Sequence, residues 1–144
     1  PSLMADGSYA KIVGNYDQYV KRQIGRVRKH YNGGTVLSVG CGNGDIENEL
    51  PFDVVCYDIH DTAKKKHPQL DFRYEWPEER FDLVICLGAV MSYIHPSNQP
   101  SFVQRLIDST KESGKIIISG IGYTGNSEPV YPTQYISHPK IKVL

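Results

Sequence analysis

The chain has 144 residues, which is enough for one domain with a hydrophobic core of its own. Its 16 basic and 16 acidic residues give a formal net charge of +0, so no overall field attracts nucleic acid or an anionic membrane. Hydrophobic residues make up 40% and charged residues 22% of the chain, which is ordinary for a globular protein, and no apolar run is long enough to span a membrane.

Residues 1–34 are expected to form an N-terminal helical segment. Apolar side chains follow one another at helical spacing over residues 9–31, and a glycine pair at 33–34 ends the pattern. The basic residues between 21 and 29 fall on the other face. This is typical of a solvated helix face, and a surface for phosphate is the sharper alternative.

Residues 35–45 read Thr-Val-Leu-Ser-Val-Gly-Cys-Gly-Asn-Gly-Asp, an aliphatic strand that stops at three alternate glycines. A strand that breaks into glycines before a helix is how an α/β sheet builds a nucleotide crevice, because glycine lets the backbone approach a ligand. The dinucleotide fingerprint needs a glycine where Asp45 stands, which disfavours a nicotinamide enzyme. The carboxylate of Asp45 suits a ligand with a cationic end instead. A turn without a ligand is the alternative.

The rest of the chain alternates strands with helices, which predicts a doubly wound, mainly parallel α/β sheet in a single domain, residues 1–144. A helix is expected to begin at Pro100 and to end at Gly114. The further strands are expected at 54–58, 70–74, 81–87 and 115–120, with short helices near 45–50 and 64–66.

Residues 121–144 look like a largely irregular tail with a terminal strand at 141–144, so the C-terminal part of the fold is reduced. The fifth strand then keeps an open edge, and an open edge invites pairing with another chain. We therefore expect a homo-oligomer or a partner chain bound through this edge.

The cysteines Cys41, Cys56 and Cys86 are odd in number and form no C-x-x-C pair. This pattern supports neither a zinc site nor a disulfide framework, so no metal is predicted. A reducing compartment suits these cysteines, and no signal peptide precedes the first turn. We expect a cytoplasmic protein.

Ligands of parallel sheets bind at the carboxyl ends of the strands. Asp58 ends the second strand, where an acid is placed to accept hydrogen bonds from ribose hydroxyls. Its alternative role is to cap the turn at 58–61. Trp76 follows the third strand and either packs on a base or fills the edge of the core; the sequence leaves both open.

These segments resemble the class I S-adenosylmethionine-dependent methyltransferases over residues 9–120. Residues 36–44 are similar to the first motif of that family, residues 81–86 to its fourth-strand motif, and residues 112–118 to its turn into the fifth strand. The resemblance implies a Rossmann-like fold with S-adenosylmethionine as cofactor, in which Ile59 packs on adenine. The implied cofactor contacts are Ser38, Gly40, Cys41, Gly42, Asn43, Gly44, Asp58, Ile59, Glu75, Trp76, Leu87 and Gly88.

The chain departs from the family at Ser38, where the family usually has an acid. A serine cannot offset the ammonium charge of the cofactor, so we expect either weaker affinity or compensation by Asp45.

The resemblance implies methyl transfer to an unidentified acceptor that lies between residues 89–100 and the tail. A base is needed only if the acceptor must lose a proton, and the candidates are His95, Tyr93 and His60, although a lone loop histidine is more often structural. Tyrosines of the tail are expected to form an aromatic floor or to pack on the surface: Tyr123, Tyr131 and Tyr135.

Residues 87–90 lack the Asn/Asp-Pro-Pro-aromatic signature of similar enzymes that methylate amino groups of nucleic acids. This favours a small-molecule acceptor over a DNA base. Two other functions stay open. The first is a non-catalytic S-adenosylmethionine-binding module that acts with a partner chain. The second is a different enzyme that uses the same crevice, such as one that cleaves the cofactor.

Overall fold

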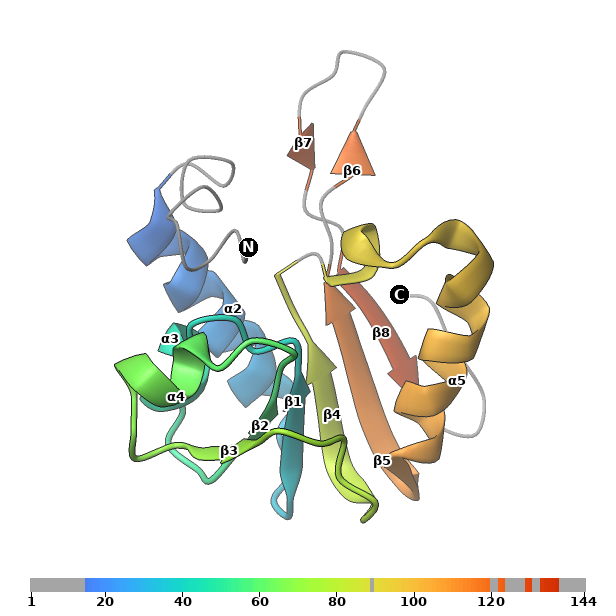
Figure 1. Ribbon diagram of the computed structural model, residues 1–144, viewed down its shortest axis with the longest axis horizontal. Helices are drawn as coiled ribbons and strands as arrows, with labels where there is room; N and C mark the ends of the chain where they lie inside the picture. Colours follow the sequence, from blue (N-terminus) through green and yellow to red (C-terminus); the bar gives the residue numbers. More distant parts are fainter. Residues whose placement is uncertain (1–14, 89, 120–121, 124–128, 131–132, 138–144) are drawn as a thin grey trace.

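The computed structural model describes residues 15–88, 90–119, 122–123, 129–130 and 133–137. A six-stranded sheet has the strand order β3-β2-β1-β4-β5-β8, and a two-stranded ribbon pairs β6 with β7 (Figure 1). The elements are α2 (Tyr16–His30), β1 (Val36–Val39), α3 (Asp45–Glu49), β2 (Val55–Tyr57), α4 (Thr62–Lys66), β3 (Asp71–Arg73), β4 (Phe81–Cys86), η1 (Val90–Tyr93), η2 (Pro96–Asn98), α5 (Gln99–Asp108), β5 (Thr110–Ser119), β6 (Gly122–Tyr123), β7 (Pro129–Val130) and β8 (Thr133–Ser137).

The first five strands of the large sheet are parallel to their neighbours, and β8 is antiparallel to β5. Helix α5 covers one face of this sheet, and α2 lies with α3 and α4 on the other (Figure 1). The predicted doubly wound, mainly parallel α/β fold is therefore confirmed. Among the described helices, none combines the length and apolar content that a membrane crossing requires.

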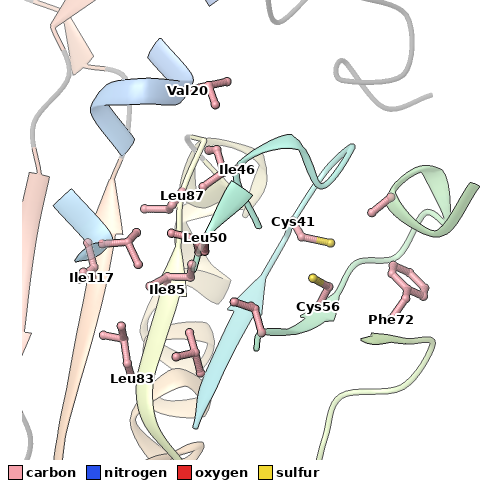
Figure 2. Close-up of a cluster of buried hydrophobic side chains, with 14 of the residues drawn as sticks. Val20, Cys41, Ile46, Leu50, Cys56, Phe72, Leu83, Ile85, Leu87 and Ile117 are labelled. Carbon is pink, nitrogen blue, oxygen red and sulfur yellow. The ribbon is translucent and has the colours of Figure 1, made fainter. Parts of the chain in front are cut away.

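Two hydrophobic clusters hold the helices on the sheet because alternate residues of a strand point to opposite faces. In β1, Val36 belongs to the cluster under α2, α3 and α4, whereas Leu37 belongs to the cluster under α5. In β4, Ile85 and Val84 divide in the same way. Figure 2 shows the first cluster, where side chains of the helices meet those of the central strands.

Helix α2 begins at Tyr16 after the N-cap residue Asn15, whose side chain accepts a hydrogen bond from the Gln18 amide at 3.1 Å. Its basic last turn complements the helix dipole. The N-terminal part of the predicted helical segment, residues 1–14, lies outside the described residues.

Helix α5 ends earlier than the sequence predicted. It stops at Asp108, and Gly114 lies inside β5. The reason is local: the hydroxyl of Ser109 donates to the Arg105 carbonyl at 2.9 Å, and that of Thr110 donates to the Leu106 carbonyl at 2.7 Å. These side chains satisfy carbonyls that a longer helix would bond internally.

The prediction of an open β5 edge is also wrong, whereas most of the predicted irregular tail, residues 121–144, lies outside the described residues. Strand β8 pairs with β5 along its length, from Lys115 opposite Ser137 to Ser119 opposite Thr133. Residues 133–137 include threonine, tyrosine and isoleucine, which suit a strand. The predicted strand at 141–144 lies outside the described residues. Because β8 covers the β5 edge, the expectation of an oligomer loses its main argument and stays a prediction.

Candidate functional site

A loop of three glycines follows β1 at the carboxyl edge of the sheet. Gly40, Gly42 and Gly44 all have positive φ angles, of 75°, 59° and 77°. The Gly40 amide donates to the Tyr57 carbonyl at 2.8 Å, which ties the start of the loop to the end of β2. A Cβ at Gly40 would lie 2.4 Å from a methyl carbon of Val90. The loop therefore has the tight backbone that the glycine pattern predicted.

Asp58 joins this loop to the end of β2. Its Oδ2 accepts a hydrogen bond from the Gly42 amide at 2.9 Å, and its Oδ1 accepts one from the His60 amide at 2.8 Å. The carboxylate thus caps its own turn, as the structural alternative proposed, and also contacts the glycine loop. Each carboxylate oxygen has a second lone pair, so Asp58 keeps the capacity to accept hydrogen bonds from a ligand.

Two large apolar side chains stand exposed beyond Asp58. Ile59 follows β2 and is 82% exposed, and Tyr74 follows the neighbouring β3 and is 64% exposed. The Tyr74 ring makes an edge contact with Phe72, with ring centroids 5.1 Å apart. An exposed apolar surface of this kind suits a flat base, which is the role expected for Ile59, and Tyr74 is a second candidate for it.

Trp76 packs into the core rather than standing free at the edge. Its Nε1 donates to the Ser109 hydroxyl at 2.7 Å, and its ring contacts Phe102 and lies 4.1 Å from the Arg105 guanidinium carbon. The structure therefore favours the core interpretation of Trp76. Its neighbour Glu75 is exposed.

We expect Trp76→Phe to lower stability by about 2 kcal/mol, because it removes the hydrogen bond to Ser109 and part of a packed side chain. Cofactor affinity should change less than twofold. Urea denaturation and calorimetric titration measure the two quantities. A loss of affinity with unchanged stability would instead make Trp76 a ligand contact.

The carboxylate of Asp45 already has three side-chain partners within the chain. Its carboxylate accepts hydrogen bonds from Tyr16 Oη at 3.0 Å and Lys66 Nζ at 2.9 Å, and it lies 2.7 Å from His67 Nε2. Burial alone would raise the pKa of Asp45, but these partners hold it below the ordinary value. The carboxylate of Asp45 is therefore already paired with Lys66 of α4.

Glu47 is the carboxylate that meets Ser38, and the sequence did not indicate it. The Ser38 hydroxyl donates to Glu47 Oε2 at 2.5 Å, and Glu47 is only 4% exposed. Burial raises the pKa of Glu47 to about 7, although the Ser38 hydrogen bond opposes the rise. The one available signal was an acid on the short helix directly after the glycine loop.

The side chains of Cys41 and Asn43 serve the loop itself. The sulfurs of Cys41 and Cys56 face each other in the core (Figure 2), and their hydrogen bond together with burial raises the pKa of the Cys41 thiol. Such a thiol stays protonated and unreactive. The Asn43 Oδ1 accepts hydrogen bonds from Tyr16 Oη at 3.2 Å and the Asp45 amide at 3.1 Å. We expect ligand contacts here from the backbone.

The end of β4 completes the edge. Leu87 is buried in the first cluster, and Gly88 has a φ of 71°. Tyr93 is exposed in η1. The ring of His95 lies on its own turn, with Nδ1 2.7 Å from the Ser97 hydroxyl, and His95 is the N-cap of η2.

The structure gives His95 a structural partner. Tyr123 and Tyr135 lie on β6 and β8, and Tyr131 lies outside the described residues. In the described part of the chain, no three histidine, cysteine or acidic side chains gather closely enough to hold a metal ion.

Solved structures with a similar fold include several S-adenosylmethionine-dependent methyltransferases. One from Archaeoglobus fulgidus has a TM-score of 0.65 and 19% identity, over 78% of this chain and 56% of its own. An amino pentose methyltransferase from Micromonospora echinaspora, with S-adenosylmethionine bound, has a TM-score of 0.64 and 16% identity, over 83% of this chain and 56% of its own. A TehB-like enzyme from Corynebacterium glutamicum has a TM-score of 0.63 and 20% identity, over 85% of this chain and 74% of its own.

The chain spans little more than half the length of the first two of these proteins. No family model matches the sequence, and no curated protein matches it. At these identities the likeness concerns the fold alone. In this fold β1 lies beside β2, so the glycine loop after β1 and Asp58 after β2 are neighbours. The chain therefore has the fold of the class I S-adenosylmethionine-dependent methyltransferases.

Proposed function

We propose that the chain binds S-adenosylmethionine and transfers its methyl group to a small-molecule acceptor. The contact between Gly42 and Asp58 carries this proposal, because it joins a left-handed glycine loop to an acid with spare acceptor capacity at the edge where parallel sheets bind nucleotides. The amino pentose methyltransferase among the similar structures supports the choice of a small acceptor.

In this proposal the protein mainly orients its ligands. S-adenosylmethionine supplies an activated methyl group on a sulfonium, so the chain has to align it with the acceptor and exclude water. Asp58 binds the ribose, Ile59 and Tyr74 cover the base, and the glycine loop admits the remainder close to the backbone. Removal of a proton by His95 or Tyr93 stays a prediction, and the hydrogen bond of His95 to Ser97 favours its structural role.

A thermal shift tests cofactor binding. S-adenosylmethionine at a hundred times its Kd adds about 2.7 kcal/mol, which we expect to raise the melting temperature by roughly 10 °C. S-adenosylhomocysteine should give a similar shift, and NAD should give none because Asp45 replaces the third glycine of the dinucleotide fingerprint. If neither adenosyl compound shifts the melting temperature at any pH between 5.5 and 8, the proposal is wrong.

Transfer itself is tested with radiolabelled methyl groups and a panel of amino sugars and other small amines. The second candidate function is a non-catalytic S-adenosylmethionine-binding module, which is motivated by Ser38, a serine where the family usually has an acid. Binding without label in any acceptor would support the module.

We also propose a reducing compartment, the cytoplasm, for the chain. All three cysteines are free and buried in the structure, which supports this placement. Light scattering tests the predicted homo-oligomer or partner chain, and a monodisperse monomer would count against it.

A further inference from the structure

Glu47 is a buried acid beside Ser38 of β1, and one of its carboxylate oxygens is unsatisfied. Its Oε2 accepts the hydrogen bond from Ser38, but Oε1 has no hydrogen-bond partner among the described residues. A buried carboxylate without compensation costs several kcal/mol, so this arrangement is unfavourable in a protein without ligand. Either a proton or a cation from outside must offset its charge.

Among the residues that the structure describes, the charged groups that act most strongly on Glu47 are both acids. They are Asp45, on the same helix, and Asp58, after β2. Tyr16 of α2 and Cys41 of the glycine loop also sense its charge, and both are neutral at pH 7. The field from these elements is therefore negative or neutral, and it favours a positively charged ligand group.

The position of Glu47 selects which part of the ligand it meets. Ser38 lies on β1, and β1 lies between β2 and β4 in the sheet. If Asp58 and Ile59 hold the nucleoside at the end of β2, the other end of an adenosyl ligand extends past the glycine loop towards the ends of β1 and β4. That end of S-adenosylmethionine carries the amino acid ammonium group.

We propose that Glu47 of α3 is the anionic contact for the ammonium group at the amino acid end of the cofactor. Its carboxyl group then gives up a proton when the cofactor binds. This inference rests on the proposed function. It assigns to α3 a charge that Ser38 of β1 cannot provide. It also makes cofactor affinity depend on pH, because the neutral acid of the free protein must ionise in the complex.

The direction of this dependence follows from the burial of Glu47. Burial raises the pKa of the free protein's Glu47 to about 7, so the carboxyl is mostly neutral at pH 5.5 and half ionised near pH 7. A ligand that requires the ionised form then binds about 15-fold more tightly at pH 7.0 than at pH 5.5. Close to one proton should be released at the lower pH and about half a proton at the higher one.

Calorimetric titration of the full chain with S-adenosylmethionine tests the inference. Titrations at pH 5.5 and 7.0, each in two buffers of different ionisation enthalpy, give both affinity and proton release. We expect Glu47→Gln to remove the pH dependence and the proton release and to weaken binding at pH 7.0 by about 10-fold or more, as loss of a charged hydrogen bond predicts. Glu49→Gln is the matched control, since Glu49 is an exposed acid of the same helix and should behave as the parent.

A second ligand separates contact from support. 5′-Methylthioadenosine keeps the nucleoside and lacks the amino acid end, so its affinity should be equal in the parent and in Glu47→Gln. If the variant weakens both ligands alike, Glu47 only supports the site and the inference is overturned. The inference also fails if the variant binds S-adenosylmethionine with the parent's affinity and pH profile, while the proposed function stands. If the parent does not bind S-adenosylmethionine at all, it is the proposed function that fails.

Discussion

Asp58→Ala is expected to weaken S-adenosylmethionine binding by about 100-fold. In the proposed function the substitution removes two charged hydrogen bonds to the ribose hydroxyls, each worth about 1.5 kcal/mol or more. It also releases the Gly42 amide, which Asp58 Oδ2 holds at 2.9 Å, so the glycine loop loses its link to β2. Calorimetric titration at pH 7.5 measures the loss.

A milder change at the same position separates the two effects. Asp58→Asn keeps one acceptor oxygen, but its amide group would face a backbone N–H, so we expect a loss of about 10-fold. Asp61→Ala is the control, because Asp61 forms only a surface ion pair with Lys65 at 3.3 Å and caps α4 without a side-chain hydrogen bond. Equal affinities for the parent and Asp58→Ala would contradict the ribose contact.

Glu47→Gln is expected to make the protein without ligand more stable at pH 8, by roughly 3 kcal/mol. The pKa of Glu47 is about 7 in the folded chain and near 4.5 when the side chain is solvated. The folded state therefore binds more protons than the unfolded state between these values, and the parent loses stability as pH rises from about 4.5 to 7. Glutamine has no charge to bury and avoids this loss.

Urea denaturation at pH 4.5 and pH 8 measures the effect. The parent and Glu47→Gln should have nearly equal stability at pH 4.5 and differ at pH 8, and Glu49→Gln should follow the parent at both. A difference that is the same at both pH values would mean that packing, rather than ionisation, separates the two proteins. Greater stability combined with weaker cofactor binding is the usual mark of a residue kept for function.

The sequence predicted those parts of the fold that local pattern determines. Residues 81–87 are a nearly continuous apolar run, and they form the central strand β4 with the predicted position. The glycine loop was equally predictable, because three alternate glycines after an aliphatic strand indicate a tight turn with positive φ angles. Asp58 followed from its place at the end of the next strand.

Features that depend on tertiary contacts escaped prediction. Strand β8 is only five residues long. Its pairing with β5 depends on contacts between distant segments, which local sequence pattern does not reveal. The end of α5 depends on two hydroxyls that bond back to the helix. Glu47 lies on a five-residue helix, which is too short for periodicity to reveal the face that packs against β1.

The parallel pairing of β1 with β4 has a consequence for how the chain folds. Val36 pairs with Leu83, so the chain between these two middle strands, which includes α3, β2, α4 and β3, has to form a long loop before they can pair. Closing such long loops slows folding relative to a helical bundle of equal size. The glycine loop is bonded to β2 and packs against η1, which follows β4. We therefore expect the proposed cofactor site to form late in folding, after β1, β2 and β4 have paired.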